Sequence, residues 1–219
     1  DHRFTPAPEA AHLARIRQEH FMKHIVFDIG SVLIEWDPVL SFEDAFESRA
    51  ACEAFLKRVD FDRLNVAGDA GATFAQMAEL VEDPADAALL PQYIDRYTKS
   101  VYAKIEGTWD ILRTLKAKGH PVHAITNWSA ETWPEGVKAH PELADAFDTL
   151  IVSGEVRMVK PSLAIFDLLC ERAGVAAGEC IFIDDGLQNV AGARAAGMDA
   201  IHFTGPEALA STLKDRGVL

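Results

Sequence analysis

Cysteine is scarce in this sequence, and long apolar runs are missing. The three cysteines, Cys52, Cys170 and Cys180, are widely spaced and form no CxxC pair. A disulfide framework needs more thiols at closer spacing, so the pattern favours reduced thiols. No stretch approaches the roughly 20 apolar residues of a membrane-spanning helix, and no signal-peptide pattern is visible. We therefore expect a cytoplasmic protein with no membrane partner.

Positive charge is also in short supply. The 219 residues include 21 lysines and arginines against 34 aspartates and glutamates, which leaves a formal net charge of −13. A surface of that sign repels nucleic acid and anionic membranes, so we expect no nucleic-acid partner. The same charge works against an anionic substrate, which would need local cations or a metal ion at its site.

Short apolar runs, each bounded by turn or polar residues, recur along the chain. They are rich in β-branched or aromatic residues, as buried strands are. The predicted strands cover residues 24–28, 121–126, 148–153, 179–184 and 199–203. Helical patterns that stop at or near glycine alternate with them, over residues 108–118, 162–173 and 189–196. This alternation predicts an α/β fold, a Rossmann-like doubly wound parallel sheet with helices on both faces.

The stretch from residue 38 to residue 107 interrupts the alternation, because its apolar residues follow helical spacing throughout. We predict a small helical cap domain over 38–107, inserted after the first strand, and a core domain over 22–37 and 108–219. Residues 1–21 contain two prolines and several charges and are predicted to form an N-terminal extension. Surface packing and subunit pairing are both open for it, so the protein is expected to be a monomer or a homodimer.

Polar residues end or follow four of the predicted strands. The first strand ends at Asp28, the second at Thr126 and the fourth at Asp184-Asp185, while Lys160 follows the third. Parallel strands bring these ends to one edge of the sheet, where ligands bind in such folds. A carboxylate can attack phosphorus and form an aspartyl-phosphate, and the transferring group needs cations and hydrogen-bond donors. Because Mg²⁺ favours carboxylate oxygens, the set predicts magnesium-assisted phosphoryl transfer.

Each of these residues also has a plainer interpretation. Asp28 could cap a strand end, Lys160 could be a solvated surface charge, and Asp184-Asp185 could cap the following helix. Thr126 could satisfy backbone groups, and Trp36 could pack between the cap and the core. The occurrence of all four polar segments in order favours a functional site.

The four segments resemble the four motifs of the haloacid dehalogenase superfamily in order and spacing, over roughly residues 23–203. The runs 27–33, 158–161 and 182–185 look like the branch of α-D-glucose-1-phosphate phosphatase. They are also similar to the amino-terminal phosphatase domain of soluble epoxide hydrolase. The resemblance implies a Mg²⁺-dependent hydrolase of the phosphomonoesterase type, acting on a small phosphorylated metabolite and, within that class, on a sugar phosphate.

The resemblance also implies residue roles. The catalytic residues would be Asp28 as nucleophile, with Lys160 and Thr126 contacting the phosphoryl group. The metal would be held by Asp28, the backbone carbonyl of Gly30 and Asp185, with Asp184 acting through water. The substrate contacts would come from Ser31, Trp36 and Asn127.

One position departs from the superfamily pattern. Most phosphatases of the superfamily carry a second aspartate two residues after the nucleophile as general acid and base, and this chain has Gly30 there. Such help is typically worth about 10²–10⁴-fold in rate. Either turnover is slow, or the leaving group needs little protonation, or another group supplies the proton. The glucose-1-phosphate branch shares this glycine.

Two other functions stay open. A 2-haloacid dehalogenase would use Asp28 without a metal, but such enzymes lack the acidic pair of Asp184-Asp185 and carry Tyr-Gly-Thr where this chain has residues 29–31. A non-enzymatic binding protein on the same scaffold would agree with Gly30, but the retention of Asp28 and Lys160 argues against it.

Overall fold

Five parallel strands form the central sheet of the protein. The computed structural model describes residues 22–219, so the predicted extension over residues 1–21 lies outside the described residues. The strands are β1 His24–Phe27, β4 Val122–Thr126, β5 Thr149–Val152, β6 Cys180–Asp184 and β7 Asp199–His202. Their order is β5-β4-β1-β6-β7, so β1 lies between β4 and β6. The predicted α/β Rossmann-like fold is confirmed.

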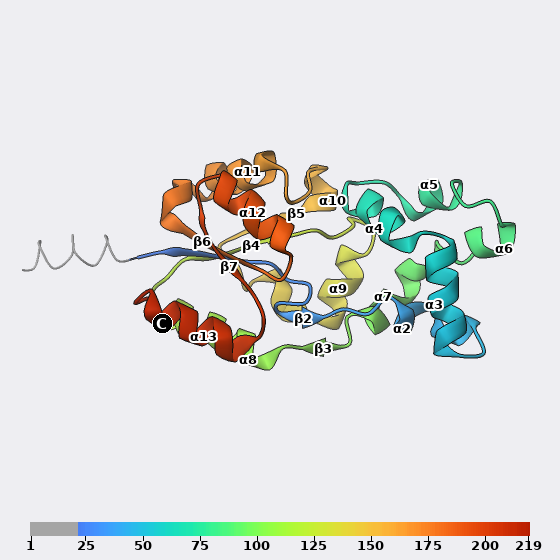
Figure 1. Ribbon diagram of the computed structural model, residues 1–219, viewed down its shortest axis with the longest axis horizontal. Coiled ribbons are helices and arrows are strands. Elements are labelled where there is room, and N and C mark those ends of the chain that lie inside the picture. The colour runs from blue at the N-terminus through green and yellow to red at the C-terminus, as the bar shows by residue number, and fades with distance from the viewer. Residues whose placement is uncertain (1–21) are drawn as a thin grey trace, which may run out of the picture.

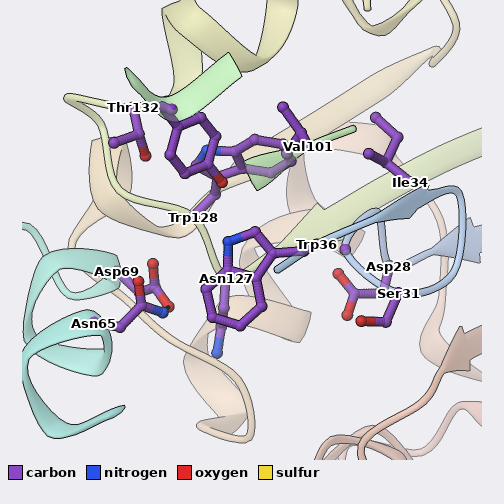
Figure 2. A pocket seen from close by; sticks show the side chains of 12 residues that line it. Asp28, Ser31, Ile34, Trp36, Asn65, Asp69, Val101, Asn127, Trp128 and Thr132 are labelled. Carbon is purple, nitrogen blue, oxygen red and sulfur yellow. Dashed lines mark hydrogen bonds between the residues drawn. The ribbon is translucent and has the colours of Figure 1, made fainter. Parts of the chain in front are cut away.

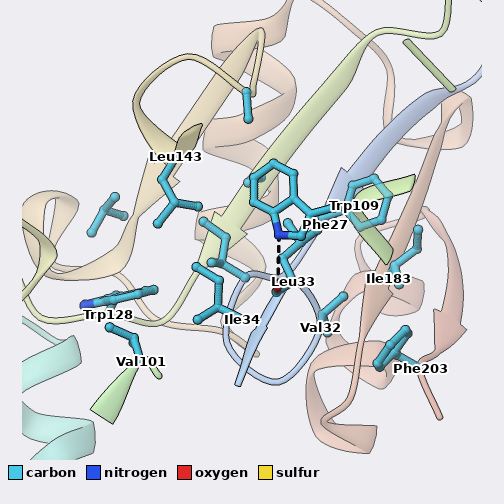
Figure 3. Packing of buried hydrophobic residues seen from close by; sticks show 14 of the residues in the cluster. Phe27, Val32, Leu33, Ile34, Val101, Trp109, Trp128, Leu143, Ile183 and Phe203 are labelled. Atoms are coloured by element: carbon cyan, nitrogen blue, oxygen red, sulfur yellow. Dashed lines mark hydrogen bonds between the residues drawn. The ribbon is translucent and has the colours of Figure 1, made fainter. Parts of the chain in front are cut away.

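The strands are apolar because helices cover both faces of the sheet. Every residue of β4 and β6 is buried. Helices α8 Glu106–Ala117 and α13 Pro206–Asp215 cover one face, and α11 Leu163–Ala173 and α12 Leu187–Ala195 cover the other (Figure 1). On the α8 face, Trp109 packs near Phe27 and donates its indole N–H to the Leu33 carbonyl at 3.0 Å (Figure 3). This contact ties α8 to the turn that follows β1.

The described chain between β1 and α8 is mostly helical. The elements are α2 Val39–Phe42, η1 Glu43–Ala45, α3 Arg49–Arg58, α4 Phe61–Asp69, α5 Phe74–Ala78, α6 Pro84–Ala87 and α7 Gln92–Ser100. They gather at one end of the sheet (Figure 1). Their shared core is aromatic: Tyr93 stacks on Phe42 with 5.1 Å between ring centroids and meets Phe61 edge-on at 5.3 Å. We call residues 38–102 the helical segment.

Two short strands join the helical segment to the sheet. β2 Ile34–Glu35 pairs antiparallel with β3 Ala103–Lys104, so the chain enters and leaves the helical segment side by side. The sequence interpretation had residues 38–107 as helical throughout, and it was wrong about β3. Strands of two residues are too short to show the alternation by which strands are predicted.

The segment between β4 and β6 completes the fold. Its elements are α9 Trp133–Ala139, η2 Pro141–Ala144, α10 Ser153–Val156 and η3 Ala177–Glu179, besides β5 and α11. Helix α9 packs against α7, and α10 packs against α4, so this segment contacts the helical segment directly. None of the helices within residues 22–219 combines the length and the apolar character of a membrane-spanning segment.

Candidate active site

The carboxyl ends of β1, β4 and β6 bring three distant parts of the chain together. Asp28 directly follows β1, and its main-chain N–H donates to the Ile183 carbonyl of β6 at 2.8 Å. Thr126 is the last residue of β4, and Asp184 is the last residue of β6. Since β1 pairs in parallel with both neighbours, these three side chains emerge at the same edge of the sheet.

A buried lysine joins two of the carboxylates at this edge. The Nζ atom of Lys160 lies 2.8 Å from Oδ1 of Asp28 and 2.6 Å from Oδ2 of Asp184. Asn127 anchors the lysine's main chain: its side-chain oxygen accepts from the Lys160 N–H at 2.9 Å, and its side-chain nitrogen donates to the Lys160 carbonyl at 3.1 Å. The Asn127 amide therefore positions Lys160, a contact that the sequence did not predict.

Three carboxylates form a group that could hold a metal ion. One oxygen each from Asp28, Asp184 and Asp185 lies within 4.8 Å of the others. Asp184 is buried, and its Oδ1 accepts hydrogen bonds from the Gly186 N–H at 2.8 Å and from Asn189 Nδ2 at 2.9 Å. Asp185 is exposed at the rim. The two adjacent aspartates thus differ, since protein groups already engage Asp184 while Asp185 faces outward.

The electrostatics of this cluster favour an added cation. Burial raises the pKa of Asp28 well above its usual range, against the opposing charge of Lys160 and with the help of Asp184. Burial also raises the pKa of Asp185, and the charge of Asp184 adds to the effect. Burial favours a neutral Lys160, but the charges of Asp28 and Asp184 outweigh it and raise the lysine's pKa. One ammonium therefore faces three carboxylates, and a divalent ion with oxygen ligands suits such a site.

The chain turns sharply after Asp28. The Ile34 N–H donates to the Ile29 carbonyl at 3.0 Å, and the Ser31 N–H donates to the Ile34 carbonyl at 2.7 Å. Ser31 has a φ of 58°, in the left-handed region. Gly30 has no such φ, and a β-carbon there would find no atom within 4 Å. The turn therefore has room for a side chain at the position where most superfamily phosphatases carry an aspartate.

A cavity of about 150 Å³ opens beside Asp28 (Figure 2). The predicted site residues that line it are Asp28, Gly30, Ser31, Trp36 and Asn127. The predicted site residues that do not line it are Thr126, Lys160, Asp184 and Asp185. Trp36 donates its indole N–H to the Tyr93 hydroxyl at 3.2 Å. The indole N–H of Trp36 therefore already has a hydrogen-bond partner, and a ligand in the cavity would contact the apolar ring.

The far wall of the cavity comes from α4, and sequence reasoning missed Asp69 in this wall. Asn65 and Asp69 lie across the cavity from Asp28 (Figure 2). Burial raises the pKa of Asp69 to about 7, against the opposing effects of Lys160 and of a hydrogen bond from the Ser129 N–H. No motif or spacing marks Asp69 in the sequence. Arg63 of the same helix is exposed and pairs with Asp60 at 2.8 Å, so it does not line the cavity.

Apolar and aromatic side chains complete the cavity. They are Ile34, Tyr97, Val101 and Trp128, with the hydroxyl-bearing Thr132 beside them. Among the described residues, no lysine or arginine lines the cavity. The arrangement can therefore accept one anionic group next to Asp28 and Lys160, and a neutral, partly apolar remainder in the cavity.

A parallel α/β sheet with a carboxylate, a buried lysine and an acidic pair at its strand ends defines a class of hydrolase. Residues 22–197 match the family described as haloacid dehalogenase-like hydrolase. The chain belongs to this family, and the predictions of the family and of a hydrolase are confirmed.

Several curated relatives of the chain are named phosphatases. The chain is 27% identical over 182 residues to a sesquiterpene phosphatase of Aspergillus oryzae, across 83% of this chain and 90% of that protein. It is 30% identical over 122 residues to the phosphoglycolate phosphatase of Escherichia coli, but spans only 47% of that protein. A solved HAD family enzyme from Bacteroides thetaiotaomicron, a magnesium complex, has a TM-score of 0.65 at 22% identity, across 84% of this chain and 94% of that one. The similarity to this solved structure shows a shared fold.

Proposed function

We propose that this chain is a Mg²⁺-dependent phosphomonoesterase that hydrolyses a small phosphorylated metabolite through an aspartyl-phosphate on Asp28. One observation carries the proposal: the Asp28 carboxylate contacts the buried ammonium of Lys160 and also lines the cavity. An attacking carboxylate and a cation for the phosphoryl oxygens are thereby adjacent. Family membership and the phosphatase names of the relatives support the same reaction class.

Each predicted residue has a task in this reaction. Asp28 attacks phosphorus, and Lys160 neutralises charge on the nucleophile and the phosphoryl oxygens. Thr126, at the end of β4, donates its hydroxyl to a phosphoryl oxygen. Ser31 and Trp36 contact the substrate from the turn after β1 and from the cavity wall. Asn127 holds Lys160 in place through the lysine's main chain.

The donor set fits a magnesium ion. Asp28, Asp185 and the Gly30 carbonyl would be its protein ligands, with Asp184 acting through water because Gly186 and Asn189 already bind its side chain. When bound, the ion would neutralise charge on the phosphoryl oxygens and help keep Asp28 ionised. The shortage of positive charge in the cluster is the structural reason to expect it.

The helical segment would select the substrate. We propose that residues 38–107 act as a cap domain over a core domain formed by 22–37 and 108–219, because α4 and α7 supply the far wall of the cavity. With no lysine or arginine on the described cavity walls, a leaving group with its own negative charge is disfavoured. A neutral alcohol or sugar fits better, since its ring can lie against Trp36 and Trp128.

Metal dependence and the released product separate this function from the dehalogenase alternative. We expect phosphate release from p-nitrophenyl phosphate that stops in EDTA and returns with added Mg²⁺. Halide release from 2-chloropropionate in EDTA would instead support a dehalogenase. Dehalogenase activity is disfavoured because the third carboxylate of the cluster would repel the halide ion as it forms.

Asp28→Asn tests the nucleophile. An amide cannot attack phosphorus, so turnover of p-nitrophenyl phosphate should fall to background, while circular dichroism should show a folded variant because Lys160 keeps its pairing with Asp184. Acid-quenched wild-type enzyme should carry a phosphoryl group on the peptide that contains Asp28, and the variant should not. Asp62→Asn, at an exposed position of α4, is the matched control and should keep wild-type turnover. Turnover by Asp28→Asn above background would contradict the proposal.

A further inference from the structure

The proposed reaction needs a proton at the leaving-group oxygen, and position 30 has no side chain to supply it. An alkoxide departs slowly unless it is protonated while its bond to phosphorus breaks, and such help is typically worth about 10²–10⁴-fold. Among the described residues that line the cavity, the carboxyl groups are those of Asp28 and Asp69. Asp28 is the attacking group, so Asp69 is the carboxyl group left for proton transfer.

The other polar groups of the cavity are poorer acids. Burial raises the pKa of the Tyr97 phenol well above its ordinary value, so this hydroxyl holds its proton too tightly. The hydroxyls of Ser31 and Thr132 ionise only at far higher pH than a carboxyl group does. Proton transfer near neutral pH therefore depends on a carboxyl group facing the leaving group.

Asp69 is held by contacts from both the core and the helical segment. It is the last residue of α4, and its main-chain oxygen accepts a hydrogen bond from Ser153 Oγ at 2.7 Å. Its carboxylate accepts from the Ser129 main-chain N–H and from Asn65 Nδ2 at 3.2 Å. Ser129 follows β4 and Ser153 begins α10. The core therefore fixes Asp69 across the cavity from Asp28 (Figure 2).

The surroundings of Asp69 keep a proton on it over part of the neutral range. Burial raises its pKa to about 7, and Lys160 opposes this rise from the core. From α7, the phenols of Tyr93 and Tyr97 face it, and burial raises the pKa of both, so they stay neutral. A general acid works best when its pKa lies near the operating pH.

We propose that Asp69 donates the proton to the leaving-group oxygen and then serves as the base for the attacking water. This inference rests on the proposed function. First, a bond forms between an Asp28 oxygen and phosphorus while the bond from phosphorus to the leaving oxygen breaks, and the Asp69 proton moves to that oxygen. Next, a water oxygen bonds to phosphorus, the bond from phosphorus to Asp28 breaks, and Asp69 takes a proton from the water. The products are the alcohol and inorganic phosphate, and both aspartates return to their starting forms.

Leaving-group dependence tests this role. Benzyl phosphate and p-nitrophenyl phosphate both carry one ring, but only the benzyl alkoxide needs a proton to depart. In Asp69→Asn, kcat/KM for benzyl phosphate should fall by about 10²–10⁴-fold, and kcat/KM for p-nitrophenyl phosphate by far less. The asparagine oxygen can still accept the Ser129 N–H, so the fold should persist. Asp62→Asn makes the same substitution on the exposed face of the same helix and should retain wild-type values for both substrates.

Two outcomes of the variant would overturn the inference. Equal losses on the two substrates would mean that Asp69 binds the substrate or shapes the cavity. An unchanged kcat/KM for benzyl phosphate would mean that Asp69 takes no part in the reaction.

The wild type gives a second measurement that needs no variant. Its kcat/KM for benzyl phosphate should fall as pH rises through about 7, more steeply than its kcat/KM for p-nitrophenyl phosphate. A flat benzyl phosphate profile would also overturn it. A wild-type enzyme inactive on both esters would remove the proposed function, and this inference with it.

Discussion

Replacing Lys160 with methionine removes the ammonium group that lies 2.8 Å from Asp28 and 2.6 Å from Asp184, and changes side-chain volume little. The lysine and Asp184 side chains are fully buried, and that of Asp28 is 11% exposed. Removing one partner of a buried ion pair typically costs about 3–5 kcal/mol, because the remaining charge is left uncompensated. Each kcal/mol shifts the melting temperature of a protein of this size by about 2–4 °C, so Lys160→Met should lower it by about 6–20 °C.

The size of that loss should depend on pH. Burial holds the pKa of Asp28 above its unfolded value, and Lys160 opposes this rise, so the methionine variant should have a still higher pKa. A group with a raised folded-state pKa stabilises the protein while it is protonated in both states, and this stability is lost as pH rises. The deficit of the variant should therefore be largest at about pH 8 and smaller at about pH 5.

Thermal unfolding followed by circular dichroism, with EDTA present so that the cluster stays free of metal, measures both effects. Lys104→Met is the control, since the Lys104 side chain is 29% exposed and pairs with Glu142 at the surface. Exposed pairs contribute about 0–1 kcal/mol, so this control should lose little stability at either pH. A Lys160→Met variant that melts close to the wild type, or whose deficit is the same at both pH values, would refute the charge-balance reasoning.

Two further predictions concern packing and positioning. In Gly136→Ala, the added β-carbon would lie 2.4 Å from Cζ2 of Trp128, so urea unfolding should show a loss of about 1–3 kcal/mol. In Gly30→Ala, the added β-carbon would meet no atom within 4 Å, so this variant should keep wild-type stability. Equal losses of stability in the two variants would contradict the packing argument. Asn127→Ala removes both hydrogen bonds to the Lys160 main chain and should cost about 1–3 kcal/mol and lower kcat several-fold. Wild-type turnover in that variant would show that Lys160 needs no such anchor.

The sheet was predictable because strands buried on both faces are short, nearly continuous apolar runs. Asp28, Thr126 and Asp184 mark where three of these runs leave the core, and the structure brings all three to one edge. The β2–β3 pair was missed because two residues are too few to show a period. The Asn127 side chain was interpreted as a substrate contact, and its bonds to Lys160 were missed because they depend on how two loops meet.

By itself, the sequence determined the alternating strands and helices, and it determined which acids, hydroxyl and lysine stand at the strand ends. Hydrophobic periodicity and the common direction of parallel strands are regular enough to be visible along the chain. Only the tertiary structure decided that Lys160 lies between two buried carboxylates and that Asp69 shares a cavity with Asp28. These contacts join residues far apart in sequence. The first arises where the ends of β1 and β6 meet the loop before α11, and the second arises from the packing of α4 against α10, and no local pattern encodes either.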